Sequence, residues 1–174
     1  KKISNYTSFT NFQIIKRPKK FSLDNSSTEE ALKHSLEYLK KKNNYIPTHI
    51  IILEPTSPVR KIISIKKFIN AVIRKKNYKS FISVVNLSSD PLLINSKGHL
   101  NFLRKNQPRR RQLREKIYIE GSGMYGFTFS NFILSSQIIM KPIFPYIISK
   151  IESIDINDYE DLFIAKAILK KSMK

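Results

Sequence analysis

The chain has 174 residues, of which 41% are hydrophobic and 26% are charged, and its formal net charge is +19. This length suits one domain with a sizeable core, and the apolar content is too high for a wholly disordered chain. Cysteine is absent, which excludes disulfide bonds, thiolate metal ligands and a cysteine nucleophile and fits a reducing compartment, so we expect a cytoplasmic protein.

The first half of the chain predicts alternating strands and helices. Ser27 and Glu30 have the spacing of a capping box, which marks the start of a helix. Alternation of this kind is typical of a parallel sheet with helical crossovers. In chain order the predicted elements are a strand at Phe12–Ile15, a helix at Thr28–Lys42, a strand at Thr48–Leu53, a helix at Ile62–Lys76 and a strand at Phe81–Asn86.

The second half begins with a polar, basic and irregular segment, Ser88–Glu115, which predicts a hairpin or arm that leaves the sheet. We therefore predict a single α/β domain over residues 1–174, with a mainly parallel sheet flanked by helices and with residues 88–115 as its arm. The remaining predicted elements are strands at Lys116–Ile119 and Met124–Phe129, a helix at Ser130–Gln137 capped by Ser130, an edge strand at Ile143–Ile148 interrupted by Pro145, and a helix at Tyr159–Lys170.

The charge invites a nucleic-acid interpretation, because cationic surfaces gain affinity by releasing counterions from phosphate backbones. The lysines are spread along the whole chain, however, so nucleic acid is not the partner we favour. The densest basic cluster, Arg104–Arg114, is either a solvated loop or a site for phosphates or a carboxylate, which guanidinium groups bind well. No apolar run approaches the roughly 18 residues of a membrane-spanning helix, so we expect no membrane partner.

Four segments at predicted strand ends carry candidate chemistry. The three histidines lack metal-ligand spacing, and four glycines are too few for a glycine-rich phosphate loop. The four segments are Lys16–Thr28, Leu53–Arg60, Arg109–Leu113 and Glu152–Asn157.

Each segment has an ordinary alternative. The first feeds a helix N-terminus, which can bind a phosphate, but alone it is better explained as a capped helix. The second is a proline-stiffened loop after a buried strand, where open α/β sheets place ligands, or else a tight turn. In the fourth, Asp155 and Asn157 share one side of an extended segment, which suits Mg²⁺; the alternative is a helix cap by Asn157 or Asp158.

Taken together and in order, these segments resemble the cytidylyltransferases that make CMP-activated nine-carbon acidic sugars, the CMP-N-acetylneuraminate synthetases. The resemblance covers nearly the whole chain, and its most specific part is the pair Pro55-Thr56-Ser57-Pro58 and Ser153-Ile154-Asp155-Ile156. It implies a Rossmann-like nucleotidyltransferase fold and a homodimer, in which the arm forms the dimer contact and reaches into the partner's site. The other matching motifs are Arg17-Pro18 with Phe21–Asp24 and Ser27-Thr28, Arg109–Leu113 before Gly121–Tyr125, and Asp161-Leu162.

The resemblance also implies a reaction, in which CTP and a sialic-acid-like sugar give CMP-sugar and pyrophosphate with Mg²⁺ as cofactor. Asp155 and Arg111 are the implied catalytic residues. The implied contacts are Arg17, Asp24 and Ser27 with the nucleotide, Glu54, Thr56, Ser57 and Arg111 with the sugar or a phosphate, and Asp155 and Asn157 with Mg²⁺.

This sequence departs from the family pattern at several places. Asn157 replaces a second carboxylate, and Glu54 replaces a glutamine beside an anionic substrate. Lys1–Thr10 does not match the opening strand and basic loop that cradle the triphosphate, so we expect the sequence to be N-terminally incomplete and these residues alone to be inactive. The alternatives that remain are an inactive truncated homologue and a basic nucleic-acid-binding module.

Overall fold

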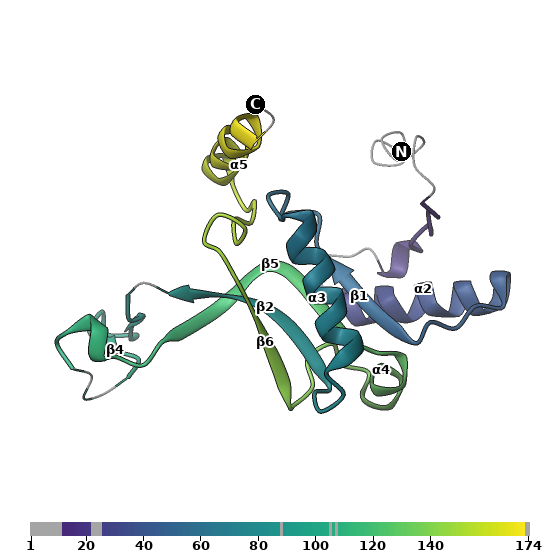
Figure 1. Cartoon of the computed structure of the whole chain (residues 1–174), viewed down its shortest axis with the longest axis horizontal. Coiled ribbons are helices and arrows are strands. Elements are labelled where there is room, and N and C mark those ends of the chain that lie inside the picture. The colour runs from purple at the N-terminus through teal and green to yellow at the C-terminus, as the bar shows by residue number, and fades with distance from the viewer. Residues whose placement is uncertain (1–11, 22–25, 88, 105, 107, 173–174) are drawn as a thin grey trace. The chain divides into compact units, whose positions relative to one another are not determined.

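The structure, a computed structural model, describes residues 12–21, 26–87, 89–104, 106 and 108–172 (Figure 1). These residues form two compact units. The first comes from residues 1–48 and 129–137, and the second comes from residues 49–128 and 138–174. The single domain expected over residues 1–174 stays a prediction.

Helix α2 (Thr28–Asn43) is the main element of the first unit, and its start confirms the capping box. The backbone N–H of Glu30 donates to the Ser27 hydroxyl at 3.1 Å, and the Glu30 carboxylate accepts from the backbone N–H of Ser27 at 3.2 Å. The helix ends at Asn44, whose φ of 49° is left-handed, a usual way to terminate a helix.

Two local predictions for the first unit are wrong. Residues 12–15 form no strand, because a strand needs a paired neighbour and Phe12 is instead 71% exposed. Helix α4 (Phe129–Ser135) begins one residue before Ser130, so Ser130 lies inside the helix and is not its cap. A short 3-10 helix, η1, spans Lys19–Phe21.

The second unit is built on a four-stranded sheet with the order β1-β5-β2-β6. Strand β5 runs antiparallel to both of its neighbours, whereas β2 and β6 pair in parallel, so β1, β2 and β6 all point the same way. The predicted α/β class is confirmed, with β5 as one long strand in place of the two expected. The sheet elements are β1 (His49–Leu53), β2 (Ser80–Leu87), β5 (Ile117–Thr128) and β6 (Ile143–Ile148), and α3 (Ile62–Arg74) connects β1 to β2.

Helix α3 lies over one face of this sheet and closes the core (Figure 1). Its apolar side chains recur at helical spacing, so one face is buried while lysines occupy the other. The edge strand β6 contains Pro145, which cannot donate a ladder hydrogen bond and is tolerated at an edge, as expected. The buried members of the core are Phe68, Val72, Phe81, Val85, Met124 and Ile148.

A bulge interrupts β5 opposite Ser83. The register with β2 shifts between Ile82 and Val84, and Ser122 and Gly123 adopt left-handed φ values of 57° and 46°. The buried Ser83 hydroxyl donates to the Gly121 carbonyl and accepts from the backbone N–H of Met124 at 3.0 Å. One side chain therefore replaces the ladder hydrogen bonds that the bulge removes.

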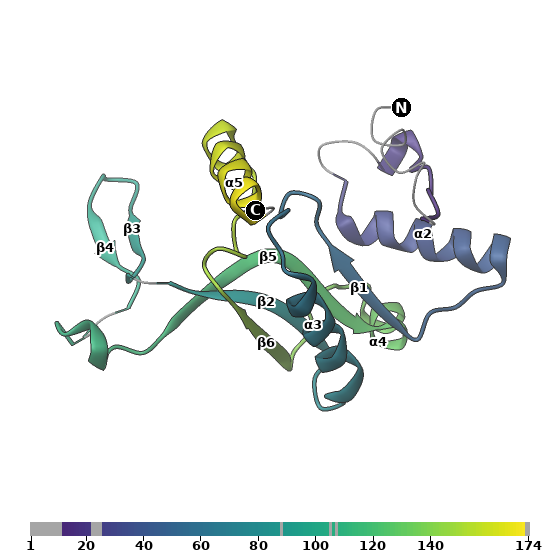
Figure 2. The same cartoon turned by 45° about the horizontal axis from the view of Figure 1, so that its top comes forward.

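The hairpin predicted within residues 88–115 is present (Figure 2). Strands β3 (Leu92–Ile94) and β4 (Leu100–Phe102) pair antiparallel as a separate two-stranded sheet, followed by the 3-10 helix η2 (Arg111–Leu113). The last helix, α5, spans Tyr159–Ser172 and confirms the expected C-terminal helix. Among the described residues, no helix is long and apolar enough to cross a membrane.

Replacing Ser83 by alanine should destabilise the fold by about 1–3 kcal/mol, because buried backbone groups of the bulge lose their partner. Urea denaturation measures this change. Ser96→Ala, in the exposed turn of the hairpin, is the matched control and should leave the free energy of unfolding within about 0.5 kcal/mol of its original value. Equal stabilities for the two variants would contradict this role of Ser83.

Candidate functional site

Three segments distant in sequence meet in the second unit. They are the loop 54–60 after β1, the bulge 121–123 of β5 and the segment 153–157 after β6. Because β1 and β6 point the same way, the carboxyl ends of both strands lie at the same end of the sheet, where α/β folds place their ligands. Two of the four segments singled out in the sequence, Leu53–Arg60 and Glu152–Asn157, therefore converge. Residues 121–123, which follow the Arg109–Leu113 motif, lie beside them.

Arg60 joins the loop to the bulge. Its Nη1 donates to the Ser122 carbonyl at 2.6 Å, and its Nη2 donates to the Glu54 carbonyl at 2.6 Å. Burial lowers the pKa of Arg60, whereas the nearby Glu54 and Asp155 carboxylates raise it. The sequence motif contained Arg60 without indicating a role, and the fold shows that it fixes the loop through charged hydrogen bonds to backbone.

Glu54 lies directly over Gly123. The backbone N–H of Glu54 donates to the Gly123 carbonyl at 3.0 Å, which continues the pairing of β1 with β5 into the loop. A Cβ atom at Gly123 would lie 2.6 Å from Oε2 of Glu54, so only glycine leaves room for the carboxylate here. The positive φ of Gly123 also favours glycine at this position.

Asp155 is oriented by Ser57. The Ser57 side chain is fully buried, and its hydroxyl donates to Oδ1 of Asp155 at 2.8 Å. The backbone N–H of Ile156 donates to the Thr56 carbonyl at 2.9 Å, which ties the same two segments a second time. Ser57 therefore acts on Asp155; its predicted contact with substrate, like that of the exposed Thr56, stays a prediction.

Asn157 is exposed and belongs to the start of α5. Its backbone N–H donates to Oδ2 of Asp161 at 3.0 Å, and the backbone N–H of Asp161 donates to Oδ1 of Asp158 at 2.8 Å. Asp158 thus supplies the helix-capping side chain that the sequence left open between two residues. The predicted role of Asn157 in holding Mg²⁺ stays a prediction.

Asp155 is the carboxylate of this site that could hold the predicted magnesium ion. In the described part of the chain, no group of three or more His, Cys, Asp or Glu side chains converges. Ser57 binds Oδ1 of Asp155, and Oδ2 has no hydrogen-bond partner within the described residues. Mg²⁺ is commonly held by one or two carboxylates together with substrate phosphates and water, and Asp155 fits that mode of binding.

Tyr125 lies close to the same carboxylates. Its hydroxyl donates to Oε2 of Glu120 at 2.8 Å. Burial raises the pKa of Tyr125 above its ordinary value, and the charges of Glu120, Glu54 and Asp155 raise it further. Tyr125 therefore stays a neutral donor at neutral pH.

The predicted nucleotide-binding residues belong to the first unit. Nη1 of Arg17 donates to the Phe21 carbonyl at 3.3 Å, and the Ser27 hydroxyl serves the cap of α2. Asp24 lies outside the described residues. Arg111 opens η2, and its side chain is also outside what the structure describes. The predicted roles of these residues stay predictions.

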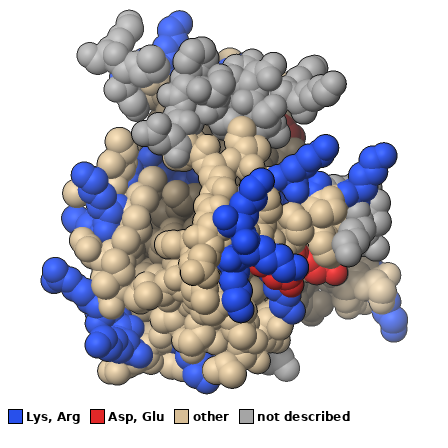
Figure 3. All heavy atoms as spheres, turned by 90° about the vertical axis from the view of Figure 1, so that its right-hand side faces the viewer, with Lys and Arg blue, Asp and Glu red and all other residues tan. Residues whose placement is uncertain are grey.

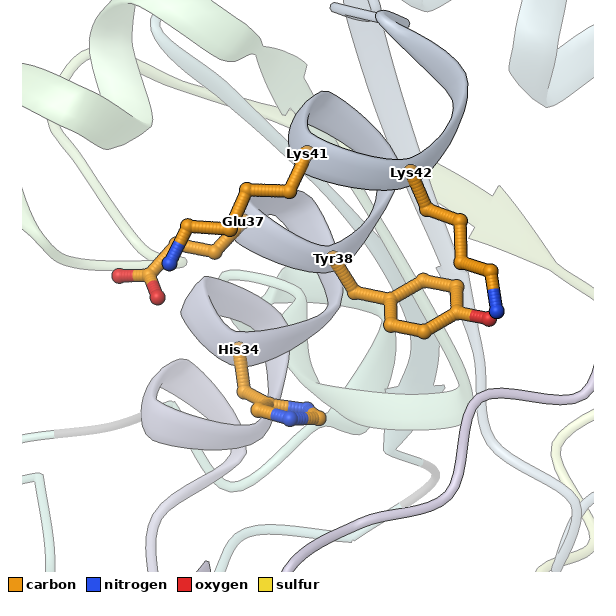
Figure 4. A pocket seen from close by; sticks show the side chains of 5 residues that line it. All are labelled: His34, Glu37, Tyr38, Lys41 and Lys42. Carbon is orange, nitrogen blue, oxygen red and sulfur yellow. The ribbon is translucent and has the colours of Figure 1, made fainter.

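A hollow of about 560 Å³ lies along α2 (Figure 4). Tyr38 and Lys42 point to one side, where the lysine amine lies 5.7 Å from the centre of the tyrosine ring, while Glu37 and Lys41 point to the other. Its described lining residues, which also include His34, all come from this one helix. Binding pockets usually collect polar groups from several elements, so this hollow is not the candidate site.

The basic cluster at Arg104–Arg114 is partly paired. Asp90 forms ion pairs with Arg104 and, at 2.5 Å, with Arg114. The hydrogen bond from Arg104, with support from Arg114, holds the pKa of Asp90 below its usual range although burial opposes this. In Figure 3, lysines and arginines occur in several separate groups on the face shown. These two arginines fix the base of the hairpin and are not free cations for nucleic acid.

No known family model matches the chain, and no curated protein sequence does. Among solved structures, the chain is similar to the 4-diphosphocytidyl-2C-methyl-D-erythritol synthase of Anaerococcus prevotii, with a TM-score of 0.52 and 14% identity. The match covers 83% of this chain and 67% of the synthase. The likeness is one of fold, and it confirms the predicted α/β class.

Replacing Asp90 by asparagine should release the hairpin, because both arginines lose a charged partner. Hydrogen exchange of the amides in residues 92–103 should then accelerate at neutral pH. In the unsubstituted chain the pairing should persist below the ordinary aspartate pKa and fail as the pH falls through the lowered pKa of folded Asp90.

Glu115→Gln is the matched control for this experiment. Glu115 is 86% exposed and reaches Arg104 only at 3.4 Å, so its loss should change the exchange little. Equal exchange in the Asp90 and Glu115 variants would contradict the structural role of Asp90.

Proposed function

We propose that this chain belongs to a cytidylyltransferase that activates a nine-carbon, sialic-acid-like sugar with CTP and releases pyrophosphate. The observation that carries the proposal is the convergence of the Pro-Thr-Ser-Pro loop, the glycine bulge and Asp155 at one end of the sheet. The fold supports cytidylyl transfer, because the similar synthase is named for a product that carries a diphosphocytidyl group. The proposal that the substrate is an acidic sugar rests on the sequence motifs that resemble the CMP-N-acetylneuraminate synthetases.

In this reaction the anomeric hydroxyl of the sugar attacks the α-phosphorus of CTP, the bond to the β-phosphate oxygen breaks, and pyrophosphate leaves. Asp155 would hold Mg²⁺, which, when bound, offsets the charge of the triphosphate. Ser57 keeps the Asp155 carboxylate oriented, and Arg60 keeps the loop closed on the bulge. Catalysis by these residues is mainly positioning, as in other phosphoryl transfers.

The negative charge of Glu54 is compatible with an anionic substrate because Arg60 compensates it. The two side chains interact electrostatically, and the Arg60 guanidinium also binds the Glu54 carbonyl. Residual repulsion should still weaken the binding of a sugar carboxylate compared with a neutral side chain at this position.

The hairpin is the proposed dimer contact. Its side chains are apolar but exposed, with Ile94 at 72% and Phe102 at 66%. A two-stranded hairpin is marginally stable alone, and a contiguous exposed apolar surface commonly marks an interaction site. A homodimer would cover these side chains.

The Asp155→Asn substitution should reduce Mg²⁺-dependent pyrophosphate release from CTP and N-acetylneuraminate by about 100-fold or more, because the carboxylate that would hold the ion is lost. The complete gene product is assayed by coupled detection of pyrophosphate.

Glu160→Gln is the control for Asp155→Asn. It removes one negative charge from the first turn of α5, where the side chain is exposed, and should leave turnover unchanged. Full turnover in the Asp155 variant would remove this residue from the site. No pyrophosphate release by the unsubstituted protein with any eight- or nine-carbon sugar acid would overturn the proposed function.

The Glu54→Gln substitution should lower the KM for the sugar acid about three- to ten-fold while kcat changes little, because a like charge beside the sugar carboxylate disappears. Steady-state kinetics measure the two constants. The carboxamide analogue of the sugar is the control, since it carries no charge and its KM should not respond. An unchanged or higher KM for the acid would place the carboxylate away from Glu54.

A further inference from the structure

Helix α3 begins without a cap from its own sequence. Its N-cap residue is Lys61, which makes no side-chain capping hydrogen bond, and its first turn has no acidic residue. The first N–H groups of a helix lack intrahelical partners and need another acceptor. In this fold the acceptor for the backbone N–H of Lys61 is the side chain of Glu152, which lies 91 positions further along the chain.

Glu152 supplies it. Its Oε1 accepts from the backbone N–H of Lys61 at 3.3 Å, and its Oε2 accepts from the Ser149 hydroxyl at 2.8 Å. Ser64, in the first turn of α3, forms a further side-chain hydrogen bond with Glu152. The Glu152 residue is only 5% exposed. A carboxylate at a helix N-terminus is also favoured by the positive end of the helix dipole.

Glu152 is charged in this environment. Burial alone would raise its pKa, but the hydrogen bonds from Ser64, Ser149 and the Lys61 backbone bring the pKa below its usual value. A buried carboxylate with this many donors is a strong link, because removing the charge leaves several polar groups without a partner.

Both residues joined by this hydrogen bond, Lys61 and Glu152, are close in sequence to residues of the candidate site. On one side, Lys61 directly follows Arg60, which closes the loop on the bulge. On the other side, Glu152 precedes the segment in which Asp155 accepts from Ser57 and Ile156 donates to Thr56. Movement of the segment around Glu152 relative to the start of α3 would therefore shift Asp155 relative to Ser57.

We propose that Glu152 is a positioning residue, which acts through Asp155 by locking residues 149–157 to the start of α3. Its importance for turnover rests on the proposed function, but the lock itself does not. A residue that only stabilised the fold would affect all parts of the second unit alike. A positioning residue should affect residues 149–157 and the geometry at Asp155 more than the rest of the core.

The test is Glu152→Gln, which preserves size and removes the charge, compared with Val72→Ala. Val72 lies on the buried face of α3 near the end of that helix, is 3% exposed and makes none of the hydrogen bonds of Glu152, so its truncation lowers stability without removing them. Hydrogen exchange under native conditions, read at the Ile156 amide and at the first turn of α3, measures the lock directly. The Mg²⁺ concentration for half-maximal turnover measures its consequence at Asp155.

In the Glu152 variant, exchange at Ile156 and in the first turn of α3 should accelerate together by about tenfold or more, and the half-maximal Mg²⁺ concentration should rise by a similar factor. In the Val72 variant, the melting temperature should fall without either selective change. Ser64→Ala, which keeps the Glu152 charge, should give a smaller effect of the same kind and replaces Glu152→Gln if that variant does not fold.

Unchanged exchange at Ile156 in the Glu152 and Ser64 variants would overturn the proposal, and so would exchange that accelerates equally in the Val72 variant. If the unsubstituted protein releases no pyrophosphate, the proposed function fails while the exchange data still decide whether the lock exists. If exchange at Ile156 and in the first turn of α3 accelerates selectively in the Glu152 variant but the half-maximal Mg²⁺ concentration is unchanged, the positioning role at Asp155 is overturned.

Discussion

The guanidinium of Arg60 is the contact on which the candidate site depends. It binds two carbonyl oxygens, one six residues before it and one 62 residues after it, and so joins a loop to a bulge that the chain forms much later. Both acceptors are backbone atoms, so the contact fixes the path of the main chain without using the carboxylates of Glu54 and Asp155. The loop is stiffened by Pro55 and Pro58, which reduces the entropy lost when it is fixed.

Charge balance in the second unit follows from this arrangement. Burial lowers the pKa of Arg60, whereas the charges of Glu54 and Asp155 favour its protonated form. Nearby opposite charges help a partly buried cation to persist in the fold. Asp90 repeats the principle with reversed signs at the base of the hairpin, where one carboxylate holds two arginines. A chain with a net charge of +19 thus uses some of its few carboxylates at structurally critical places.

Local signals predicted the parts of the fold that local physics determines. The capping box at Ser27 and the apolar spacing of α3 specified their helices, and Pro145 indicated the edge position of β6. The two motifs that carry most of the family resemblance, the loop after β1 and the segment at Asp155, are joined in the fold by the hydrogen bond from Ser57 to Asp155.

The parts that sequence reasoning missed depend on long-range partners. The position of β5 between β1 and β2 is determined by strand pairing between distant parts of the chain. An apolar run such as Phe12–Ile15 becomes a strand only where another strand pairs with it. Ser83 and Glu152 resemble ordinary polar residues until the fold brings a bulge and a helix start to them.

The two edges of the sheet differ in what they offer to another strand. On β6, Pro145 removes a backbone donor, so the ladder on that side is interrupted. β1 consists of His49-Ile50-Ile51-Ile52-Leu53, with neither proline nor a formal charge, and it ends the sheet order among the described residues. Among the described residues, the edge at β6 is therefore protected by a proline against pairing with a further strand, whereas Ile50–Leu53 of β1 has no such protection.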